Sequence, residues 1–297
     1  MIEVKNLTKK MGQSVILNNI SCTINDGCVY GLIGANGAGK STLLRLLTGV
    51  YKKDSGEILV DGEPVYENIS AKKKIAYVPD DLYFISGANL NRMEKLYASL
   101  FPDFSHERYK ELLDVFKLDP KKQIATFSKG MRRQGAILLA LSCRTKYIFF
   151  DETFDGLDPV MRNVVKRIIA SDVLERNATA IITSHSLREL EDTCDQLSLL
   201  HNGGIVFESD IQNLKTNMFK IQIGLDREYD KSLFDGLDVI SFVKHGSVST
   251  LIVRDKDCME KLKSLSPILL EALPLTLEEV FIYETEALGY SFNDIIK

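Results

Sequence analysis

The chain has 297 residues, of which 45% are hydrophobic and 26% charged, as expected for a soluble globular protein with one large or two modest domains. A net charge of -4 and a pI of about 5.7 argue against a nucleic-acid partner. No apolar run reaches the roughly 18 residues of a membrane span, and the first residues lack the apolar core of a signal peptide. Five scattered cysteines without C-x-x-C spacing disfavour disulfides and zinc. We therefore expect a cytoplasmic protein that meets a membrane only through a partner.

Short apolar runs that are typical of buried strands alternate with helical patterns up to about residue 207. In chain order they are Val29–Ile33, Ile75–Val78, Tyr147–Phe150, Ala180–Thr183 and Leu197–Leu200. This alternation predicts an α/β fold with a mostly parallel core sheet. An antiparallel β edge is predicted from three further runs, Ile2–Val4, Ser14–Ile24 and Gly56–Val60. Residues 88–125 carry no strand pattern and indicate helices, with breaks at Pro102 and Pro120.

The pattern changes near Ile211, after which short strands and tight turns prevail. The predicted elements are strands at Phe219–Leu225, Val239–Lys244, Val248–Arg254 and Ile268–Ala272, and helices at Met259–Leu265 and from Thr276. We therefore expect two domains. The first covers residues 1–210 and contains a helical subdomain at about 85–140, and the second is a small α+β domain over residues 211–297.

The most informative segment is the octet GANGAGKS at residues 34–41, which fits the phosphate-binding pattern G-x-x-x-x-G-K-[ST]. It lies between a predicted strand and a predicted helix, which is the context that the pattern requires. Glycines let the loop wrap a polyanion, and backbone N–H groups at the helix N-terminus favour negative charge. The predicted nucleotide contacts are Asn36, Gly37, Ala38, Gly39, Lys40, Ser41 and Thr42. The alternative is a glycine-rich turn that only caps a helix.

Within this loop, Lys40 is expected to reach the β- and γ-phosphates and the Ser41 hydroxyl to ligate Mg²⁺. Two carboxylates, Asp151 and Glu152, follow the apolar run at residues 147–150. Asp151 would hold the same metal, and Glu152 would polarise the attacking water. The alternative for this acidic pair is that it caps the following helix.

Two weaker signals accompany these motifs. Ser128 and Gly130 lie where an apolar helix begins, which by itself is also an ordinary N-cap pattern. His185 follows the predicted strand at residues 180–183, where a single histidine is usually structural.

Together the motifs resemble the ATP-binding subunit of ABC transporters over nearly the whole chain. In order, they are residues 34–42 (Walker A), 128–131 (signature), 149–152 (Walker B), 156–158 (D-loop) and His185 (H-loop). The resemblance implies a head-to-tail dimer, of identical or related chains, that closes on two ATP molecules. Ser128 and the backbone of Gly130 would contact the γ-phosphate bound by the partner subunit. His185 would contact the γ-phosphate, and Asp158 would couple the two sites.

The sequence departs from the common family pattern at four positions. Lys129 and Met131 replace a glycine and a glutamine of the signature, and Lys129 either approaches the γ-phosphate or points outward. Asp80 stands where a glutamine usually senses Mg²⁺ and meets the membrane subunit; a carboxylate can also ligate magnesium, so Asp80 is the third predicted metal ligand. Met11 stands where an aromatic ring often stacks on adenine, which leaves the preference for ATP over GTP open. Glu152 and His185 are both present, so we expect hydrolysis.

The segment PLTLEEVF at residues 274–281 resembles the ending of exporter-type ATPases, and the Ser-Lys-Gly-Met signature favours bacterial drug and antimicrobial-peptide exporters. The same segment could simply bury Leu277, Val280 and Phe281. We therefore expect an ATPase subunit that drives a separate, multi-span permease from the cytoplasmic face of the membrane. The alternatives are an importer subunit and a soluble ABC ATPase that acts on ribosomes or DNA. The transported substrate cannot be deduced, because a membrane subunit would select it.

Overall fold

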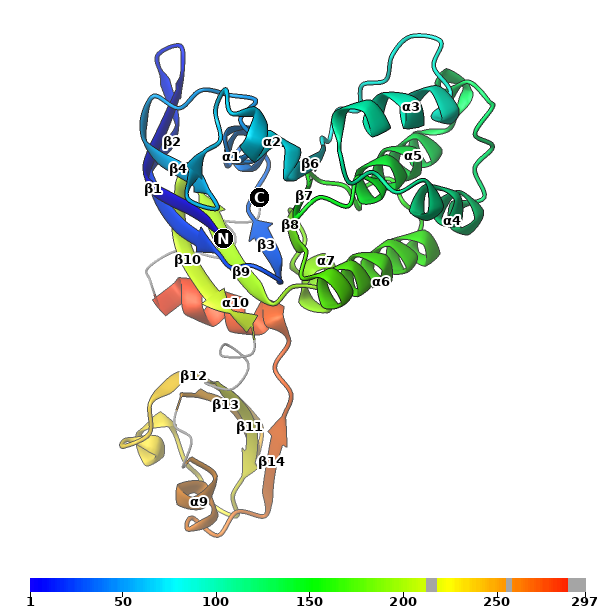
Figure 1. The fold of residues 1–297 in the computed structure, drawn as a ribbon. Helices are drawn as coiled ribbons and strands as arrows, with labels where there is room; N and C mark the ends of the chain where they lie inside the picture. Colours follow the sequence, from blue (N-terminus) through cyan, green and yellow to red (C-terminus); the bar gives the residue numbers. More distant parts are fainter. Residues whose placement is uncertain (212–217, 255–257, 288–297) are drawn as a thin grey trace. The chain divides into compact units, whose positions relative to one another are not determined.

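The computed structural model describes residues 1–211, 218–254 and 258–287 (Figure 1). Contacts within the chain divide it into two compact units, Met1–Glu208 and Ser209–Lys297. The end of the predicted second domain, residues 288–297, lies outside the described residues. None of the helices in the described part combines the length and hydropathy needed to cross a membrane.

The first unit begins with an antiparallel sheet in the order β2-β1-β4-β5. Its strands are β1 (Ile2–Met11), β2 (Ser14–Ile24), β4 (Ser55–Val60) and β5 (Glu63–Pro64). Ile2 pairs with Ile24 on one side and Val60 on the other, and all three side chains are at most 1% exposed. This sheet is the predicted antiparallel edge, although β1 extends well beyond the predicted Val4.

A second, six-stranded sheet has the order β10-β9-β3-β8-β7-β6. Its strands are β3 (Val29–Ile33), β6 (Ile75–Val78), β7 (Tyr147–Phe150), β8 (Thr179–Ser184), β9 (Gln196–His201) and β10 (Gly204–Asp210). Strands β9, β3, β8, β7 and β6 pair in parallel, so the predicted α/β fold with a mostly parallel core sheet is confirmed. Strand β10 was not predicted. It follows Asn202 and Gly203, whose φ angles of 47° and 74° suit a tight hairpin.

The helices of the first unit are α1 (Lys40–Leu47), α2 (Ile69–Lys73), α3 (Leu90–Leu100), α4 (His106–Phe116), α5 (Lys129–Ser142), α6 (Pro159–Arg176) and α7 (Leu187–Glu191). Figure 1 shows α3, α4 and α5 gathered on one side of the unit, beyond β6 and β7. Two N-caps bear on the site. Ser128 Oγ accepts from the Met131 N–H at 3.2 Å at the start of α5, and Asp158 caps α6.

Helix α1 is fixed between the two sheets by its apolar side chains. Leu43, Leu44, Leu46 and Leu47 are at most 2% exposed and belong to one core cluster with residues of both sheets. Burial of each such side chain contributes about 1.5–3 kcal/mol. The N-terminus of α1, where the phosphate-loop motif ends, is therefore held firmly at the carboxyl end of β3.

The second unit is built on an antiparallel sheet in the order β12-β13-β11-β14. Its elements are β11 (Phe219–Gly224), β12 (Val239–His245), β13 (Val248–Val253), α9 (Cys258–Lys263), β14 (Leu269–Leu273) and α10 (Leu277–Ala287). These elements agree with the predicted small α+β arrangement. The predicted apolar face of the last helix is buried, since Leu277, Val280 and Phe281 are at most 1% exposed.

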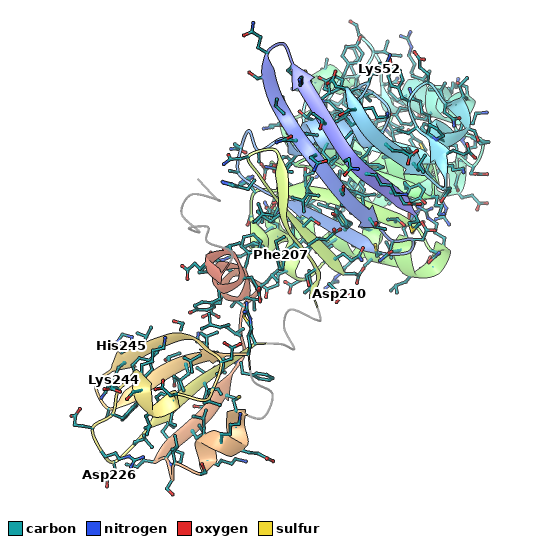
Figure 2. All side chains as sticks on the ribbon, turned by 90° about the vertical axis from the view of Figure 1, so that its left-hand side faces the viewer. Lys52, Phe207, Asp210, Asp226, Lys244 and His245 are labelled. Carbon is teal, nitrogen blue, oxygen red and sulfur yellow. The ribbon has the colours of Figure 1, made fainter. Side chains whose placement is uncertain are left out.

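In the sheet of the second unit, the edge strand β12 ends with two polar residues, Lys244 and His245 (Figure 2). Lys244 Nζ lies 4.3 Å from the centre of the Tyr229 ring and donates to the Tyr229 carbonyl at 2.7 Å. These contacts tie the connection after β11 to the edge strand, while Ile221, Ile223 and Leu251 form the core on the sheet's packed face.

Candidate nucleotide-binding site

The loop between β3 and α1 contains glycines that are required for different structural reasons. Gly37 and Gly39 have φ angles of 84° and 108°, which L side chains rarely adopt. A Cβ on Gly34 would lie 2.4 Å from the carbonyl oxygen of Leu200 in β9. The sequence indicated only that these glycines clear space for phosphates. The structure adds that Gly34 is required by its close approach to the neighbouring strand.

Lys40, the first residue of α1, is only 5% exposed and points back into the loop. Its Nζ donates to the carbonyl oxygens of Gly34 at 2.6 Å and Ala35 at 3.1 Å, and forms a 3.0 Å ion pair with Glu152 Oε1. The ammonium group is thus held by exchangeable oxygen partners at a helix N-terminus, where an anionic group is favoured.

Asp151 at the end of β7 is fully buried, and hydroxyl groups satisfy its carboxylate. It accepts from Ser41 Oγ at 3.0 Å, Thr183 Oγ1 at 2.9 Å and Tyr77 OH at 3.2 Å. Burial, followed by the nearby Asp151 charge, raises the pKa of Tyr77, which keeps that hydroxyl a donor. In the described part of the chain, no basic side chain pairs with Asp151. A buried carboxylate without a counter-charge is costly, so this donor set suits an added cation.

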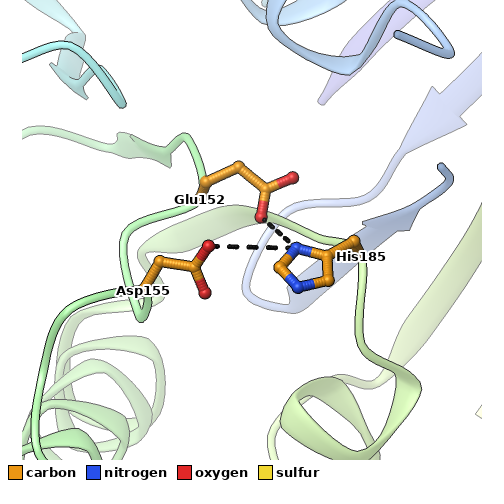
Figure 3. Close-up of side chains that lie close together, drawn as sticks. All are labelled: Glu152, Asp155 and His185. Atoms are coloured by element: carbon orange, nitrogen blue, oxygen red, sulfur yellow. Dashed lines mark hydrogen bonds and ion pairs between the residues drawn. The ribbon is translucent and has the colours of Figure 1, made fainter. Parts of the chain in front are cut away.

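Glu152 follows with a φ angle of 46°, a left-handed conformation that costs a non-glycine residue roughly 1–2 kcal/mol. Its N–H donates to Thr183 Oγ1 at 2.9 Å, which fixes this turn above β8. Its Oε2 lies 3.1 Å from His185 Nδ1, as Figure 3 shows. The side chain therefore lies between the Lys40 ammonium and the His185 ring.

Asp155, which no sequence motif indicated, also faces the His185 ring. Its Oδ2 lies 3.9 Å from His185 Nδ1 (Figure 3). Burial raises the pKa of Asp155, and the His185 charge partly offsets that effect. The imidazole, whose side chain is 45% exposed, is thus flanked by two carboxylates from the turn after β7.

Lys40, Ser41 and Glu152 border a cavity of about 340 Å³ at the carboxyl end of the parallel strands, whereas Asp151 and His185 do not line it. Its lining residues are Ile16, Asn36, Gly37, Gly39, Lys40, Ser41, Thr42, Asp80 and Glu152. Ala38, which was also predicted to contact nucleotide, is 8% exposed and does not line the cavity. Ile16 was not predicted, because it comes from β2 and only the fold brings it here. Met11, in contrast, does not line this cavity and is 39% exposed.

Ser128 and Gly130 lie elsewhere, at the N-terminus of α5. Ser128 is exposed, and neither residue lines the cavity. Gly130 is packed against the turn after Asp155, since a Cβ on it would lie 3.0 Å from the Gly156 carbonyl oxygen. The Lys129 side chain runs past the same turn, with its Cε 3.7 Å from the position of a Cβ on Gly156.

Asp80, which follows β6, lines the cavity and is also bound to α5. Its Oδ1 lies 2.9 Å from Arg133 NH2, and its backbone carbonyl accepts from Arg133 NH1 at 3.2 Å. The Asp80 side chain is 55% exposed, whereas that of Arg133 is 1% exposed. Arg133 was not singled out by the sequence, because nothing local connects it with residue 80.

Comparison with known proteins agrees with this geometry. Residues 17–155 match the ABC transporter family. The ABC transporter ATP-binding protein YtrB of Bacillus subtilis is 30% identical over 284 residues, which cover 95% of this chain and 97% of that protein. The chain belongs to the ABC transporter ATP-binding family. This ABC ATPase is also 33% identical to the bacitracin transport ATP-binding protein BcrA of Bacillus licheniformis, over 72% of its own length and 71% of that relative.

The fold of the ABC ATPase is shared with solved structures. An ATP-binding subunit of an ABC transporter aligns with a TM-score of 0.67 and 26% identity over 72% of this chain and 92% of that one. A dimeric ATP-binding cassette bound to ADP and Pi has the same fold, with a TM-score of 0.64 at 23% identity, over 71% of this chain and 99% of that one. The predicted resemblance is therefore confirmed, and the chain is an ATP-binding, ATP-hydrolysing subunit of an ABC transporter.

Proposed function

We propose that this ABC ATPase drives an exporter through a separate, multi-span permease, at the cytoplasmic face of the cell membrane. Its relatives include proteins named for bacitracin transport, lipopolysaccharide export and Nod factor export. The alternative of an importer subunit is the second candidate. The soluble ribosome- or DNA-directed ATPase is the third, and the acidic pI of about 5.7 disfavours a nucleic-acid partner.

The observation that carries the proposed hydrolysis is the position of Glu152 beside the cavity, between Lys40 and His185. In the proposed reaction Lys40 exchanges its carbonyl partners for the β- and γ-phosphates of ATP. Glu152 orients and polarises the attacking water, and His185 contacts the γ-phosphate from the opposite side of Glu152. The 3.1 Å contact keeps the His185 ring beside Glu152, which lines the cavity.

We assign Mg²⁺ binding to Ser41 and Asp151, with Asp80 as the third candidate ligand. The ion would supply charge neutralisation for the phosphates. The residues fit such an ion, because a hydroxyl and a buried carboxylate are hard oxygen donors, and the carboxylate has no basic partner among the described residues. Thr183 and Tyr77 would keep the Asp151 carboxylate in place by their hydrogen bonds.

We further propose that two subunits, identical or related, complete each other's sites. The cavity offers no described residue from α5, so the γ-phosphate side lacks the donors at Ser128 and Gly130. Those residues lie at an exposed helix N-terminus, where a partner's phosphate would find a hydroxyl, backbone N–H groups and a favourable dipole. Closure of the dimer would also exclude water.

The permease would dock in an apolar groove of about 450 Å³ beside β6 and α3. Its lining includes Val50, Tyr83 and Leu100, whose exposures are 56%, 85% and 56%. The occupant that fits is an amphipathic cytoplasmic helix of the permease, since such a helix can cover apolar side chains in a groove. Asp80, three residues before Tyr83, would connect this groove with the nucleotide cavity.

The decisive experiment is Glu152→Gln, which removes the proposed base and keeps the side chain's shape. The variant is expected to lose about 10²–10⁴-fold in ATPase rate, because a positioned base contributes that much. It should still bind ATP in calorimetry and form an ATP-dependent dimer in light scattering. Asp155→Asn, at the same turn, is the matched control and should retain most of the rate.

Normal hydrolysis by Glu152→Gln would contradict the assigned role of this carboxylate. A wild-type rate per molecule that stays constant on dilution to monomers would contradict the shared site. To test coupling to a permease, the chain is coexpressed with any multi-span protein that is encoded beside its gene. Copurification and a stimulated ATPase are expected, and loss of both in Tyr83→Asp would support the groove. Cosedimentation with ribosomes instead would favour the soluble alternative.

A further inference from the structure

The Asp80 carboxylate has two possible cationic partners in this protein. It borders the cavity together with Lys40, Ser41 and Glu152, where the proposed Mg²⁺ would lie. In the structure it is bound to Arg133 of α5, with 2.9 Å between Oδ1 and NH2. One carboxylate therefore stands between the nucleotide cavity and a guanidinium group on the helix that begins after Ser128.

Arg133 depends strongly on this contact. The side chain is 1% exposed, and its Nε is buried without a hydrogen-bond partner among the described residues. The Arg133 hydrogen bonds that the structure shows both go to Asp80, one to the carboxylate and one to the backbone carbonyl. A buried guanidinium with few partners has a high cost of losing one of them. Arg133 thus favours keeping Asp80 where it is.

Mg²⁺ binds carboxylate oxygens in a demanding geometry, so a ligand that is held by another cation must first be released. We propose that Arg133 is a positioning residue that restrains Asp80, so that binding of Mg²⁺ with nucleotide requires exchange of the Asp80 carboxylate from Arg133 to the metal. This inference rests on the proposed function of the cavity. On this proposal, α5 influences the affinity for Mg²⁺ through Arg133.

The size of the effect follows from the exposure of the pair. Because Asp80 is 55% exposed, solvent screens its attraction to Arg133, and such pairs contribute up to about 1 kcal/mol. Removing the restraint should therefore lower the Mg²⁺ concentration that half-saturates nucleotide binding by about two- to fivefold. The direction of this change distinguishes two roles of Arg133. If Arg133 competes with Mg²⁺ for Asp80, its removal strengthens Mg²⁺ binding, whereas if it supports Asp80 as a ligand, its removal weakens Mg²⁺ binding.

The test measures binding of ATP by calorimetry at graded Mg²⁺ concentrations, in the Glu152→Gln background to prevent hydrolysis. Arg133→Met is expected to lower the half-saturating Mg²⁺ concentration about two- to fivefold, without changing ATP affinity in EDTA. Arg133→Gln, which keeps a donor but no charge, should shift it in the same direction and serves if the methionine variant does not fold. Arg132→Met is the matched control, because Arg132 donates to the Phe127 carbonyl instead, and no shift is expected.

A double-mutant cycle completes the design. Asp80→Asn should raise the half-saturating Mg²⁺ concentration, and Arg133→Met should have no further effect in that background. A higher half-saturating Mg²⁺ concentration in Arg133→Met overturns the inference while leaving the proposed metal site intact. The same holds if Arg133→Met shifts this concentration equally in the presence of Asp80 and in the Asp80→Asn background. Nucleotide binding by the parent protein that ignores Mg²⁺ altogether contradicts the metal site and the inference together.

Discussion

Two buried carboxylates at opposite ends of the parallel sheet have different kinds of partner. At the carboxyl end, three hydroxyl groups donate to the buried Asp151 carboxylate, and no basic side chain of the described residues pairs with it. Near the amino end, the equally buried Asp172 carboxylate of α6 forms ion pairs with Arg108, Arg144 and Arg176. The Asp172 charge is thus paired by basic side chains, whereas the Asp151 charge has no basic partner in the described part of the chain and is available for the metal that we propose.

The amino end continues this paired arrangement around the start of β7. Lys146 Nζ donates to Asp26 at 2.9 Å and to Asp61 at 2.7 Å, and the Tyr147 hydroxyl donates to the same two carboxylates. Arg176 reaches the carbonyl oxygens of residues 144 and 145. The amino end is therefore a network for stability, and substitutions there should change unfolding without changing chemistry.

The largest expected difference contrasts Asp172→Ala with Asp151→Asn. Asp172→Ala leaves three arginines without their shared partner and should lower the free energy of unfolding by about 3 kcal/mol, while the folded protein keeps its ATPase rate. Asp151→Asn should change stability by less than about 1 kcal/mol, because neutral hydroxyls can also bond an amide, yet it should abolish hydrolysis. Urea unfolding and ATPase assays on both variants measure this.

The contrast fails if the two substitutions prove interchangeable. A large loss of stability in Asp151→Asn would mean that its carboxylate serves the fold as Asp172 does. Loss of ATPase activity by folded Asp172→Ala would mean that the amino end takes part in the chemistry. Arg176→Lys, which retains one charge of the network, is a milder companion variant and should cost less than Asp172→Ala.

A smaller effect separates two glycines of the phosphate loop. Gly34→Ala forces a Cβ against the Leu200 carbonyl oxygen and should cost about 3 kcal/mol of stability, because β9 has to move. Gly37→Ala meets no atom within 4 Å, and its cost of about 1 kcal/mol arises only from its positive φ. Thermal unfolding compares the two directly. Equal losses would show that packing against β9 is not what requires Gly34.

The smallest effect is a pH dependence at the amino end. Burial alone would raise the pKa of Asp61, but hydrogen bonds from Lys146, Tyr147 and the amino terminus outweigh it and hold the pKa below its ordinary value. The charged form therefore stabilises the fold above the ordinary carboxyl pKa of about 4, and this contribution is lost as the pH falls. The stability advantage of wild type over Asp61→Asn in urea should be full at pH 6 and smaller at pH 3. An advantage that stays constant would exclude the ionised carboxylate as its source.

The sequence was sufficient for features that are local. Apolar runs predicted β3, β6 and β7 with their observed bounds, and the motif spacing predicted that Lys40, Asp151 and Glu152 would follow strands. Non-local partners could not be predicted, since no pattern connects Tyr77 or Thr183 with Asp151, or Arg133 with Asp80. The roles assigned to Ser128, Gly130 and the metal ligands stay predictions. Residue type suggested the chemistry, whereas only the fold determined which groups compete for the same carboxylate.

The position of β3 has a consequence for folding during translation. Both of its neighbours in the sheet, β8 and β9, come from beyond residue 178, and Leu200 closes against the phosphate loop. Such distant pairings carry a high loop-closure cost and form slowly. During translation, the loop that contains the nucleotide motif emerges early, before the strands β8 and β9 that flank β3 have been made. A nascent chain stopped before β9 should therefore be unable to retain nucleotide, so ATP can assist folding only after β9 has been made.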